Sequence, residues 1–425
     1  MKILVVCDNY SKGGLETQIN TYYNNLSLGN KMIFAFGNYT KTDLLKNANI
    51  YDGFHFSYND TIKDFCNDVE RLVEIIQKEK IDVIHVHPYY GYFAALFASQ
   101  ITKVKMVYSY HGIGSYNFAK TNISQPIFLY AFECGAVAKV LSVSKIGVDC
   151  FKNFEYENAL LLENPIDFKK FPVIKYIKNN KWLLVSRIDS DKIDEIKLII
   201  SKMNDYDIKQ IDIIGDGSEF DNLNRFITDN KLNDKIYLKG YSDNIYEEAN
   251  GGYNGIIGIG RVVLESLAMK MPCILIGNNK ITGYVNKKIY DEVKDINFIN
   301  RTINDINNKM INDMEIDQIY LDIKNNFSIN VVIKKYLDIL KNSESIYMNN
   351  LVELYKGICE LNKNTDLQKC YFHKERFVYN LVEKYINKFS VKNAINNIFV
   401  NANLVYELYD LTAYRMNEEK ENKND

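Results

Sequence analysis

The stretch Gly258-Ile259-Gly260-Arg261-Val262-Val263-Leu264-Glu265-Ser266-Leu267-Ala268-Met269 follows a short apolar run that ends at Ile257. Two glycines end the run, and Val263 and Leu267 then recur at helical spacing. This order predicts a strand, a tight glycine turn and a helix N-terminus. Such a junction directs backbone N–H groups and the positive end of the helix dipole at one place, which suits an anion such as phosphate. Glu265 lies one turn into the helix, where it could reach sugar hydroxyls. A plain connection in an α/β sheet explains the stretch equally well.

A second junction of this kind opens the chain. An apolar run over residues 3–7 predicts a strand, Gly13-Gly14 lies in the loop that follows, and residues 15–26 have a helical pattern. Two adjacent glycines let the backbone approach a ligand closely. The loop does not match G-x-G-x-x-G, which argues against a dinucleotide-dependent dehydrogenase.

Strand and helix patterns alternate through most of the chain. The predicted strands form two series, the first at residues 3–7, 32–36, 83–86, 106–110, 140–143 and 160–162, the second at residues 182–185, 211–214, 236–238, 256–257 and 273–276. Helical patterns lie between them, most clearly at residues 61–80. A polar segment at residues 169–181 separates the series. We therefore predict two similar α/β domains with a cleft between them, each built on a parallel sheet covered on both faces.

The loops after these strands contain conspicuous glycine, histidine and charged residues, and ligands of such folds bind beyond the carboxyl ends of the strands. They include His85-Val86-His87, His111-Gly112, residues 187–192, Gly215-Asp216-Gly217 and Gly240-Tyr241-Ser242. His85 and His87 alternate on one predicted strand, so we expect them to face opposite sides. A metal role would need further ligands, so a structural role is the default for both.

The composition excludes several classes of protein. Of 425 residues, 47% are hydrophobic and 25% charged, which is ordinary for a globular protein. The net charge of -2, with no basic block, argues against a nucleic-acid partner. Seven cysteines without a CxxC pair indicate a reducing cytosol and neither a disulfide framework nor a zinc site. The first residues do not resemble a signal peptide, and no stretch approaches the ~20 apolar residues of a membrane span. We expect a cytoplasmic protein, with peripheral contact at the inner face of a membrane left open.

The character of the sequence changes after about residue 340. Residues 348–414 have helical periodicity, many aromatic side chains and no clear strand pattern, and residues 417–425 are mostly charged or polar. We predict helices followed by a disordered tail.

Several of these loops, in this order, resemble the family 4 retaining glycosyltransferases of GT-B architecture. The matching motifs lie within residues 1–345 and are Gly13-Gly14-Leu15-Glu16, His111-Gly112, Val143-Ser144, Glu163-Asn164-Pro165-Ile166-Asp167, Ser186-Arg187-Ile188 with Lys192, Ile214-Gly215-Asp216-Gly217 with Glu219, Gly240, and residues 258–272. The run Gly258-Ile259-Gly260-Arg261 is similar to a bacterial subgroup found among surface-polysaccharide and polymer-glycosylation genes. The order and spacing of the motifs carry the resemblance.

The resemblance implies an α/β fold of GT-B type, with two Rossmann-like doubly wound domains facing a cleft and a C-terminal helical extension. Residues 1–168 would form the acceptor domain and residues 169–345 the nucleotide-sugar donor domain, whose last helix often crosses back onto the first domain in this family. Residues 346–416 would form the helical extension and residues 417–425 the disordered tail. The extension lies outside the resemblance, so packing on the core and contact with a partner, an acceptor or a membrane face are all open.

The resemblance also implies roles for individual residues. Arg187 and Lys192 would stabilise the leaving diphosphate, His111 would lie near the donor sugar, and Glu265 would bind the ribose hydroxyls. The other implied donor-binding positions are Gly13, Gly14, Gly215, Gly240, Tyr241, Gly258, Ile259, Gly260 and Arg261. Each position also has a structural interpretation, as a turn glycine, a satisfied loop histidine, a solvated ion pair or, for Glu265, a solvent-facing helix residue.

One position departs from the family pattern. The family has two glutamates eight positions apart, and the first falls at Ile257. A different sugar, altered positioning and lost activity are all compatible with this change, and Arg261 could take over part of the polar role. The resemblance implies no metal and no cofactor besides the nucleotide-sugar, with the leaving phosphate able to accept the proton of the acceptor.

The sequence thus favours a glycosyltransferase. It would move a sugar with retention from a nucleotide donor, a UDP-sugar first, to a bacterial surface glycan, a lipid-linked glycan or a protein. Two alternatives stay open: a non-catalytic GT-B binding subunit, and a GT-B nucleotide-sugar epimerase that needs no acceptor.

Overall fold

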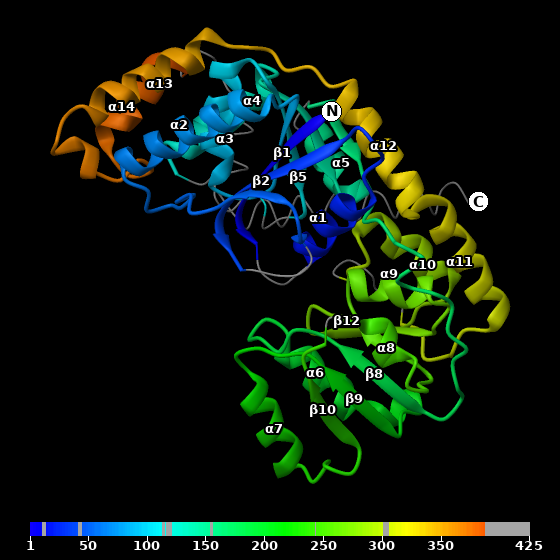
Figure 1. Cartoon of the computed structure of the whole chain (residues 1–425). Coiled ribbons are helices and arrows are strands. Elements are labelled where there is room, and N and C mark those ends of the chain that lie inside the picture. Colours follow the sequence, from blue (N-terminus) through cyan, green and yellow to red (C-terminus); the bar gives the residue numbers. More distant parts are fainter. Residues whose placement is uncertain are drawn as a thin grey trace. The chain divides into compact units, whose positions relative to one another are not determined.

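The computed structural model describes residues 1–10, 14–40, 45–112, 115, 121–153, 156–242, 244–300 and 306–386 (Figure 1). The chain forms two compact units. The first contains Met1–Glu163 and the described residues from Ile333 on, and the second contains Asn164–Val332. The chain therefore leaves the first unit shortly before the predicted boundary at residue 168, and it returns within helix α12 (Ile329–Lys341).

A seven-stranded parallel sheet forms the centre of the first unit, in the order β3-β2-β1-β4-β5-β6-β7. Its strands are β1 (Lys2–Tyr10), β2 (Lys31–Tyr39), β3 (Asn49–Tyr51), β4 (Val83–Val86), β5 (Lys105–Tyr110), β6 (Val137–Ser142) and β7 (Ala159–Leu161). This is the predicted doubly wound order, which reverses between β1 and β4. The sequence analysis missed β3, because its three residues are only partly buried and form no apolar run.

The helices of this unit before the linker are α1 (Gly14–Asn25), α2 (Ile62–Glu79), α3 (Gly91–Thr102), α4 (Ser124–Glu133) and α5 (Lys145–Asn153). Helix α2 begins with a capping box, in which the Thr61 side chain accepts from the N–H of Asp64 and the Asp64 carboxylate accepts from the N–H of Thr61. Helix α3 is buried on every side from Gly91 to Gln100. It therefore lacks the polar face that reveals a surface helix in a sequence.

The second unit has a six-stranded sheet in the order β10-β9-β8-β11-β12-β13. Its strands are β8 (Lys181–Val185), β9 (Gln210–Ile214), β10 (Ile236–Gly240), β11 (Gly255–Gly258), β12 (Cys273–Gly277) and β13 (Lys280–Tyr284). Its helices are α6 (Ile193–Ser201), η3 (Met203–Tyr206), α7 (Phe220–Asp229), α8 (Ile245–Ala249), α9 (Arg261–Ala268), α10 (Lys287–Val293), η4 (Lys294–Ile296) and α11 (Asp313–Asn326). The expectation of a wholly parallel sheet is wrong at one edge. There β13 pairs with β12 antiparallel, after a turn too short to contain a crossover helix.

The C-terminal extension contains α13 (Asn349–Asn362), η5 (Leu367–Lys369) and α14 (Arg376–Tyr385). Its buried apolar residues join the same core cluster as α2 and α3, and Figure 1 shows these four helices side by side. Leu351, Leu354 and Ile358 contribute from α13, and Val378 and Val382 from α14. Up to residue 386 the extension is therefore a helical layer on the core, and the rest of the predicted extension (387–416) and the predicted tail lie outside the described residues. None of the described helices is both long and apolar enough to cross a membrane.

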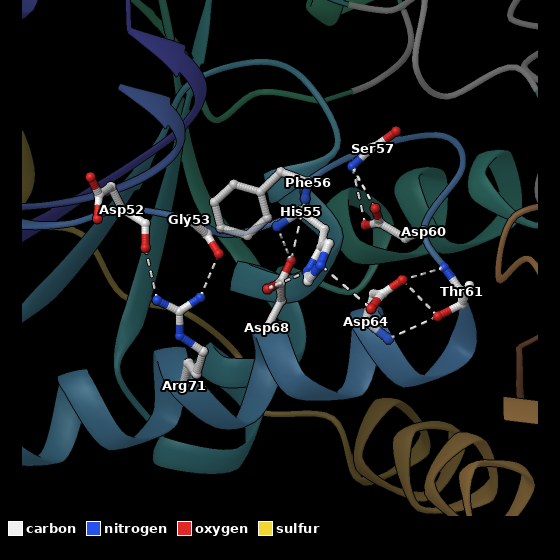
Figure 2. A network of polar contacts seen from close by, with 10 residues as sticks. All are labelled: Asp52, Gly53, His55, Phe56, Ser57, Asp60, Thr61, Asp64, Asp68 and Arg71. Atoms are coloured by element: carbon white, nitrogen blue, oxygen red, sulfur yellow. Dashed lines mark hydrogen bonds and ion pairs between the residues drawn. The ribbon is translucent and has the colours of Figure 1, made fainter. Parts of the chain in front are cut away.

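Polar contacts fix the loop between β3 and α2, as Figure 2 shows. The buried Asp68 carboxylate accepts from the N–H groups of His55 (2.9 Å) and Phe56 (3.2 Å), and Arg71 donates to the carbonyl oxygen of Gly53 (2.8 Å). Asp60 accepts from the N–H of Ser57, and burial raises the pKa of Asp60 to about 7.

The segment between α13 and α14 attaches to this loop and to the start of α2. Ile62 donates through its N–H to the carbonyl of Cys370 (2.8 Å), and Phe372 donates to the carbonyl of Asp60 (2.9 Å). The Phe372 ring also stacks on Phe65 with 3.9 Å between ring centroids. The extension is thus held by main-chain hydrogen bonds as well as by apolar packing.

Removal of the His373 imidazole should flatten the acid dependence of stability. The ring is buried against Ser124, whose Oγ lies 2.8 Å from its Nδ1, and burial with the nearby Lys374 charge lowers the pKa of His373 to about 3. The unfolded chain binds a proton there near pH 6.5 while the folded chain does not, so stability falls as the pH drops below 6.5. Between pH 6 and pH 4, wild type should lose about 1.4 kcal/mol more per pH unit than His373→Phe. Urea unfolding at several pH values measures this slope, and parallel curves for the two proteins would contradict the prediction.

Candidate functional site

In the second unit, Arg187 and the motif that begins at Gly258 follow the two strands between which the strand order reverses. Strands β8 and β11 are neighbours, while β9 and β12 lie on opposite sides of them. Loops diverge at such a point, and ligands of doubly wound folds bind beyond the strand ends there. Arg187 lies in the loop after β8, and the first glycine of the opening motif, Gly258, ends β11.

Two glycines hold the loop after β9 against the loop after β8. A Cβ atom on Gly215 would lie 1.9 Å from the carbonyl oxygen of Ser186, and one on Gly217 would lie 2.4 Å from that of Ile188. The N–H of Ile188 donates to the carbonyl of Asp216 at 2.9 Å, which joins the same loops. Both positions therefore require glycine for packing, and the contact of Gly215 with the donor stays a prediction.

Gly215→Ala should destabilise the second unit by about 2–3 kcal/mol, because the new methyl group meets a backbone carbonyl that cannot rotate away. Gly240→Ala is the matched control, since it ends the adjacent strand β10 at a φ of 76° but its Cβ would meet nothing within 4 Å. The control should lose about 1 kcal/mol from backbone strain alone. If urea unfolding gives equal losses of the unfolding free energy for Gly215→Ala and Gly240→Ala, the close approach of the Ser186 carbonyl is not the reason that residue 215 is a glycine.

Gly240 and Tyr241 also lie at the carboxyl ends of the strands. The carbonyl of Gly240 accepts from the N–H of Gly215 at 2.9 Å, so the ends of β9 and β10 are connected. Tyr241 follows directly, with half of its side chain exposed. Their predicted place beside the nucleotide base stays a prediction.

Arg187 and Lys192 are cations oriented by carboxylates. The Arg187 guanidinium donates to Asp189 (2.8 Å) and Asp191 (3.2 Å), and 60% of its side chain is exposed. Lys192 Nζ lies 3.3 Å from the Oε1 of Glu195, a buried residue, and 3.4 Å from Asp191. Exposed ion pairs contribute little to stability, so the carboxylates orient Arg187 while leaving it accessible to an anion.

Helix α9 begins directly after β11. A Cβ atom on Gly258 would lie 2.5 Å from the Cγ1 of Val262, so a glycine lets the helix start this close to the strand. Gly260 has a φ of 61°, and its N–H donates to Phe298 O at 2.8 Å. Within the described part of the chain, the N–H groups of Arg261 and Val262 have no acceptor. These are the donors that a helix N-terminus offers to phosphate.

Glu265 is buried and paired, so its interpretation as a solvent-facing residue is wrong. Its Oε1 accepts from Arg261 Nε at 2.6 Å, and Arg261 Nη2 donates to the carbonyl of Pro165 at 3.1 Å. Burial raises the pKa of Glu265, and the Arg261 charge opposes that rise. Arg261 Nη1 is buried without a partner among the described residues. Glu265 would have to share its carboxylate with Arg261 in order to bind a ribose hydroxyl.

His111 follows β5 in the first unit. Its N–H donates to Ser115 Oγ (3.0 Å), and its Nε2 lies 2.9 Å from the Nδ1 of His87. Burial lowers the pKa of His111 to about 4, so the ring is neutral at pH 7. A neutral imidazole donates through one nitrogen and accepts at the other.

The expectation that His85 and His87 face opposite sides is wrong, because their rings lie 4.4 Å apart between centroids. Strand β4 ends at Val86, so His87 follows the strand and escapes the alternation of its side chains. His85 bonds to Tyr336 Oη and Ser109 Oγ, each at 2.8 Å. Burial lowers the pKa of His85 to about 3 and that of His87 well below its ordinary value.

The predicted residues therefore fall into two sets, one in each unit. The second unit brings Arg187, Lys192, Gly215, Gly240 and the start of α9 to the carboxyl ends of its parallel strands. The first unit holds His111 and also Gly14, which begins α1, while Gly13 lies outside the described residues. Sequence reasoning left His87 as structural although it contacts His111, and the H-x-H spacing at a strand end was the available signal. The described residues contain no group of three or more His, Cys, Asp or Glu that could hold a metal ion.

Comparison with known proteins finds matches in sequence and in fold. Residues 34–169 match the model of Glycosyltransferase Family 4. The poly(glycerol-phosphate) alpha-glucosyltransferase of Bacillus subtilis is 29% identical over 94 residues, which cover 21% of this chain and 14% of that protein. The match thus spans about a seventh of that relative.

Solved structures match over both units. A glycosyltransferase from Rickettsia africae has a TM-score of 0.56 at 20% identity, covering 80% of this chain and 97% of that one. Anabaena HepE, solved with UDP and glucose, has a TM-score of 0.57 at 14% identity, covering 80% and 100%. The predicted GT-B fold, two Rossmann-like α/β domains with a helical C-terminal part, is confirmed.

Proposed function

We propose that the protein is a glycosyltransferase that moves a sugar from a nucleoside-diphosphate sugar, UDP-linked, to an acceptor hydroxyl with retention at the anomeric carbon. The observation that carries the proposal is a candidate anion site of the second unit: Arg187 and Lys192 follow β8, and helix α9 follows the neighbouring strand β11. Among the described residues, the N–H groups of Arg261 and Val262 at the start of α9 have no acceptor. The match to Glycosyltransferase Family 4 and the likeness to HepE, solved with UDP and glucose, support it.

The chemistry needs positive charge where the diphosphate leaves. As the bond between the anomeric carbon and the phosphate oxygen breaks, negative charge grows on the diphosphate, and preorganised donors there lower the barrier. Arg187 can present two N–H groups to two oxygens, and Lys192 adds a point charge. In this proposal no metal is needed. The acceptor oxygen bonds to the anomeric carbon, and its proton passes to the leaving phosphate.

The acceptor is proposed by class only. The matched Bacillus relative is named for poly(glycerol phosphate), and the subgroup resemblance is to surface-glycan transferases. The acceptor would be a surface glycan, a lipid-linked glycan or a protein. The first unit would bind this acceptor, at the cytoplasmic side of the membrane.

Thermal unfolding with UDP, GDP, ADP, CMP and dTDP tests the donor site. A nucleotide present at about 100 times its dissociation constant should stabilise the folded protein by roughly 2.7 kcal/mol. We expect UDP to give the largest shift, and UDP-sugar turnover with a retained anomeric configuration should follow in NMR spectra of the product. If no diphosphate stabilises the protein and no UDP-sugar is consumed, the proposal is wrong.

A non-catalytic binding subunit is the second candidate, and Ile257 is the observation that favours it. This residue is fully buried in β11 between Leu184 of β8 and Ile274 of β12, so it offers no polar group to a donor sugar. Such a subunit would bind UDP without consuming a UDP-sugar. An epimerase would instead convert the sugar without any acceptor, so product analysis separates the three activities.

A further inference from the structure

His87 is a buried histidine that the proposed function leaves without a role, although it contacts His111. Its N–H donates to the carbonyl of Val6 on β1 at 2.9 Å, so its backbone is fixed at the end of the sheet. Its ring lies between two others, 4.4 Å from His85 and 5.2 Å from His111 between ring centroids. Each ring nitrogen of His85 already has a partner, Tyr336 or Ser109.

Among the described residues, the polar partner of the His87 ring is His111, through the 2.9 Å contact from Nδ1 to Nε2. Burial keeps both rings neutral at pH 7. A neutral imidazole carries one N–H, so one nitrogen of this contact donates and the other accepts. The proton position on His87 therefore determines the proton position on His111.

The far nitrogen of His87 decides between the two arrangements. Its Nε2 is buried and has no partner in the described part of the chain. If Nε2 held the proton, a buried N–H would lack an acceptor, which native structures avoid more strictly than an unused acceptor. The arrangement with the His87 proton on Nδ1 leaves no N–H of this ring unsatisfied.

We infer that His87 is a positioning residue whose Nδ1–H donates to His111 Nε2 and fixes His111 as its Nδ1–H tautomer. His111 is partly exposed, and no described group contacts its Nδ1. The nitrogen left for a ligand is then a hydrogen-bond donor and not a base. This inference rests on the proposed function for its consequence: His111 would donate to an oxygen of the nucleotide sugar.

The tautomer is measured on the unliganded protein, without any activity. In long-range 1H–15N spectra of histidine-labelled protein at pH 7.5, His111 should show a protonated Nδ1 and an unprotonated Nε2, and His87 should also be protonated at Nδ1. A His111 signal protonated at Nε2 in wild type would overturn the inference, whatever the protein catalyses.

Two substitutions at His87 test the cause. His87→Asn places an amide N–H where Nδ1 lies, so His111 should keep its tautomer. His87→Leu removes the donor, and His111 should shift toward the Nε2–H form that free histidine favours. His373→Leu is the matched control, since it removes another buried histidine of the same unit and should leave the His111 signals unchanged. If His87→Leu leaves the His111 tautomer unchanged, or does not fold while His87→Asn changes it, His87 does not fix the tautomer.

Sugar transfer supplies the second readout. His87→Leu should lower kcat by about 100-fold with little change in the KM for the donor, and His87→Asn should restore it to within about 3-fold of wild type. Loss of a merely structural residue would not be rescued by a polar amide. If all variants behave as expected in the spectra but wild type transfers no sugar, the proposed function fails while the role of His87 in fixing His111 stands.

Discussion

Replacement of Arg187 and Lys192 by alanine together will lower kcat/KM for sugar transfer by roughly 1000-fold, equivalent to about 4 kcal/mol of transition-state stabilisation. Arg187 follows the end of β8 and Lys192 is the N-cap of α6, and in the proposed reaction the leaving diphosphate would gather charge there. If they stabilise the leaving diphosphate, as proposed, their contribution grows as the glycosidic bond breaks, so kcat should fall more than donor binding weakens. Steady-state kinetics with a UDP-sugar, together with the UDP-induced thermal shift, measures both effects.

The fold should largely survive this change, which keeps the test specific. Arg187 makes exposed ion pairs, and these contribute little to stability. Lys192 lies beside the buried carboxylate of Glu195, so the double variant is repeated with Glu195→Gln to remove the unpaired charge. Lys202→Ala is the matched control, because this lysine lies at the opposite end of α6 and pairs with Asp205. A similar loss of turnover in the control would remove Arg187 and Lys192 from the proposed site.

Arg261→Met will destabilise the second unit by about 3–5 kcal/mol, because it leaves the Glu265 carboxylate buried without its cation. Burial already raises the pKa of Glu265, and loss of Arg261 should raise it further. The folded variant then keeps a proton on Glu265 that the unfolded chain releases above about pH 4.3. Its stability therefore decreases as the pH rises from about 4.3 to the raised pKa of Glu265 in the folded variant. The deficit relative to wild type should be smaller at pH 5 than at pH 8. Urea unfolding at both pH values measures it.

A second substitution distinguishes the buried charge from lost packing. In the Arg261→Met background, Glu265→Gln removes the charge and keeps the shape of the side chain, so stability should return to within about 1.5 kcal/mol of wild type. No recovery would mean that Arg261 stabilises the unit through its contact with Pro165 and its packing.

The prediction of the fold from sequence succeeded where a local pattern reports burial. A strand covered by helices on both faces must be apolar along its length, so β4 was predicted with its observed bounds and β8 within one residue. It was less specific where burial depends on distant partners: a helix was expected between β4 and β5, but without bounds. Helix α3 is covered by α13 from the far end of the chain and therefore shows no polar face.

The candidate site divides in the same way. Spacing alone placed Arg187 and Gly258 at strand ends, because alternating strands and helices bring those ends to one edge of a parallel sheet. Spacing could not pair Glu265 with Arg261, since a helical i, i+4 relation permits both that ion pair and an outward-facing acid. The wrong expectation for His87 came from one residue of strand length, which decides whether its ring points away from that of His85 or lies beside it.

The sequence by itself determined the two doubly wound α/β domains and the strand–glycine–helix junction at Gly258, because burial periodicity and backbone freedom are local properties. The polar segment at residues 169–181, which the sequence set between the domains, belongs to the second unit, which begins at Asn164. The tertiary structure decided which groups satisfy one another: His87 with His111, Glu265 with Arg261, and the C-terminal extension with α2. Such pairings are selected by the requirement that every buried polar or apolar group find a partner. The extension and α2 meet through residues such as Tyr355 and Cys66, 289 positions apart, so no short sequence window contains both partners. Within one helix, the spacing of Arg261 and Glu265 permits their ion pair without requiring it.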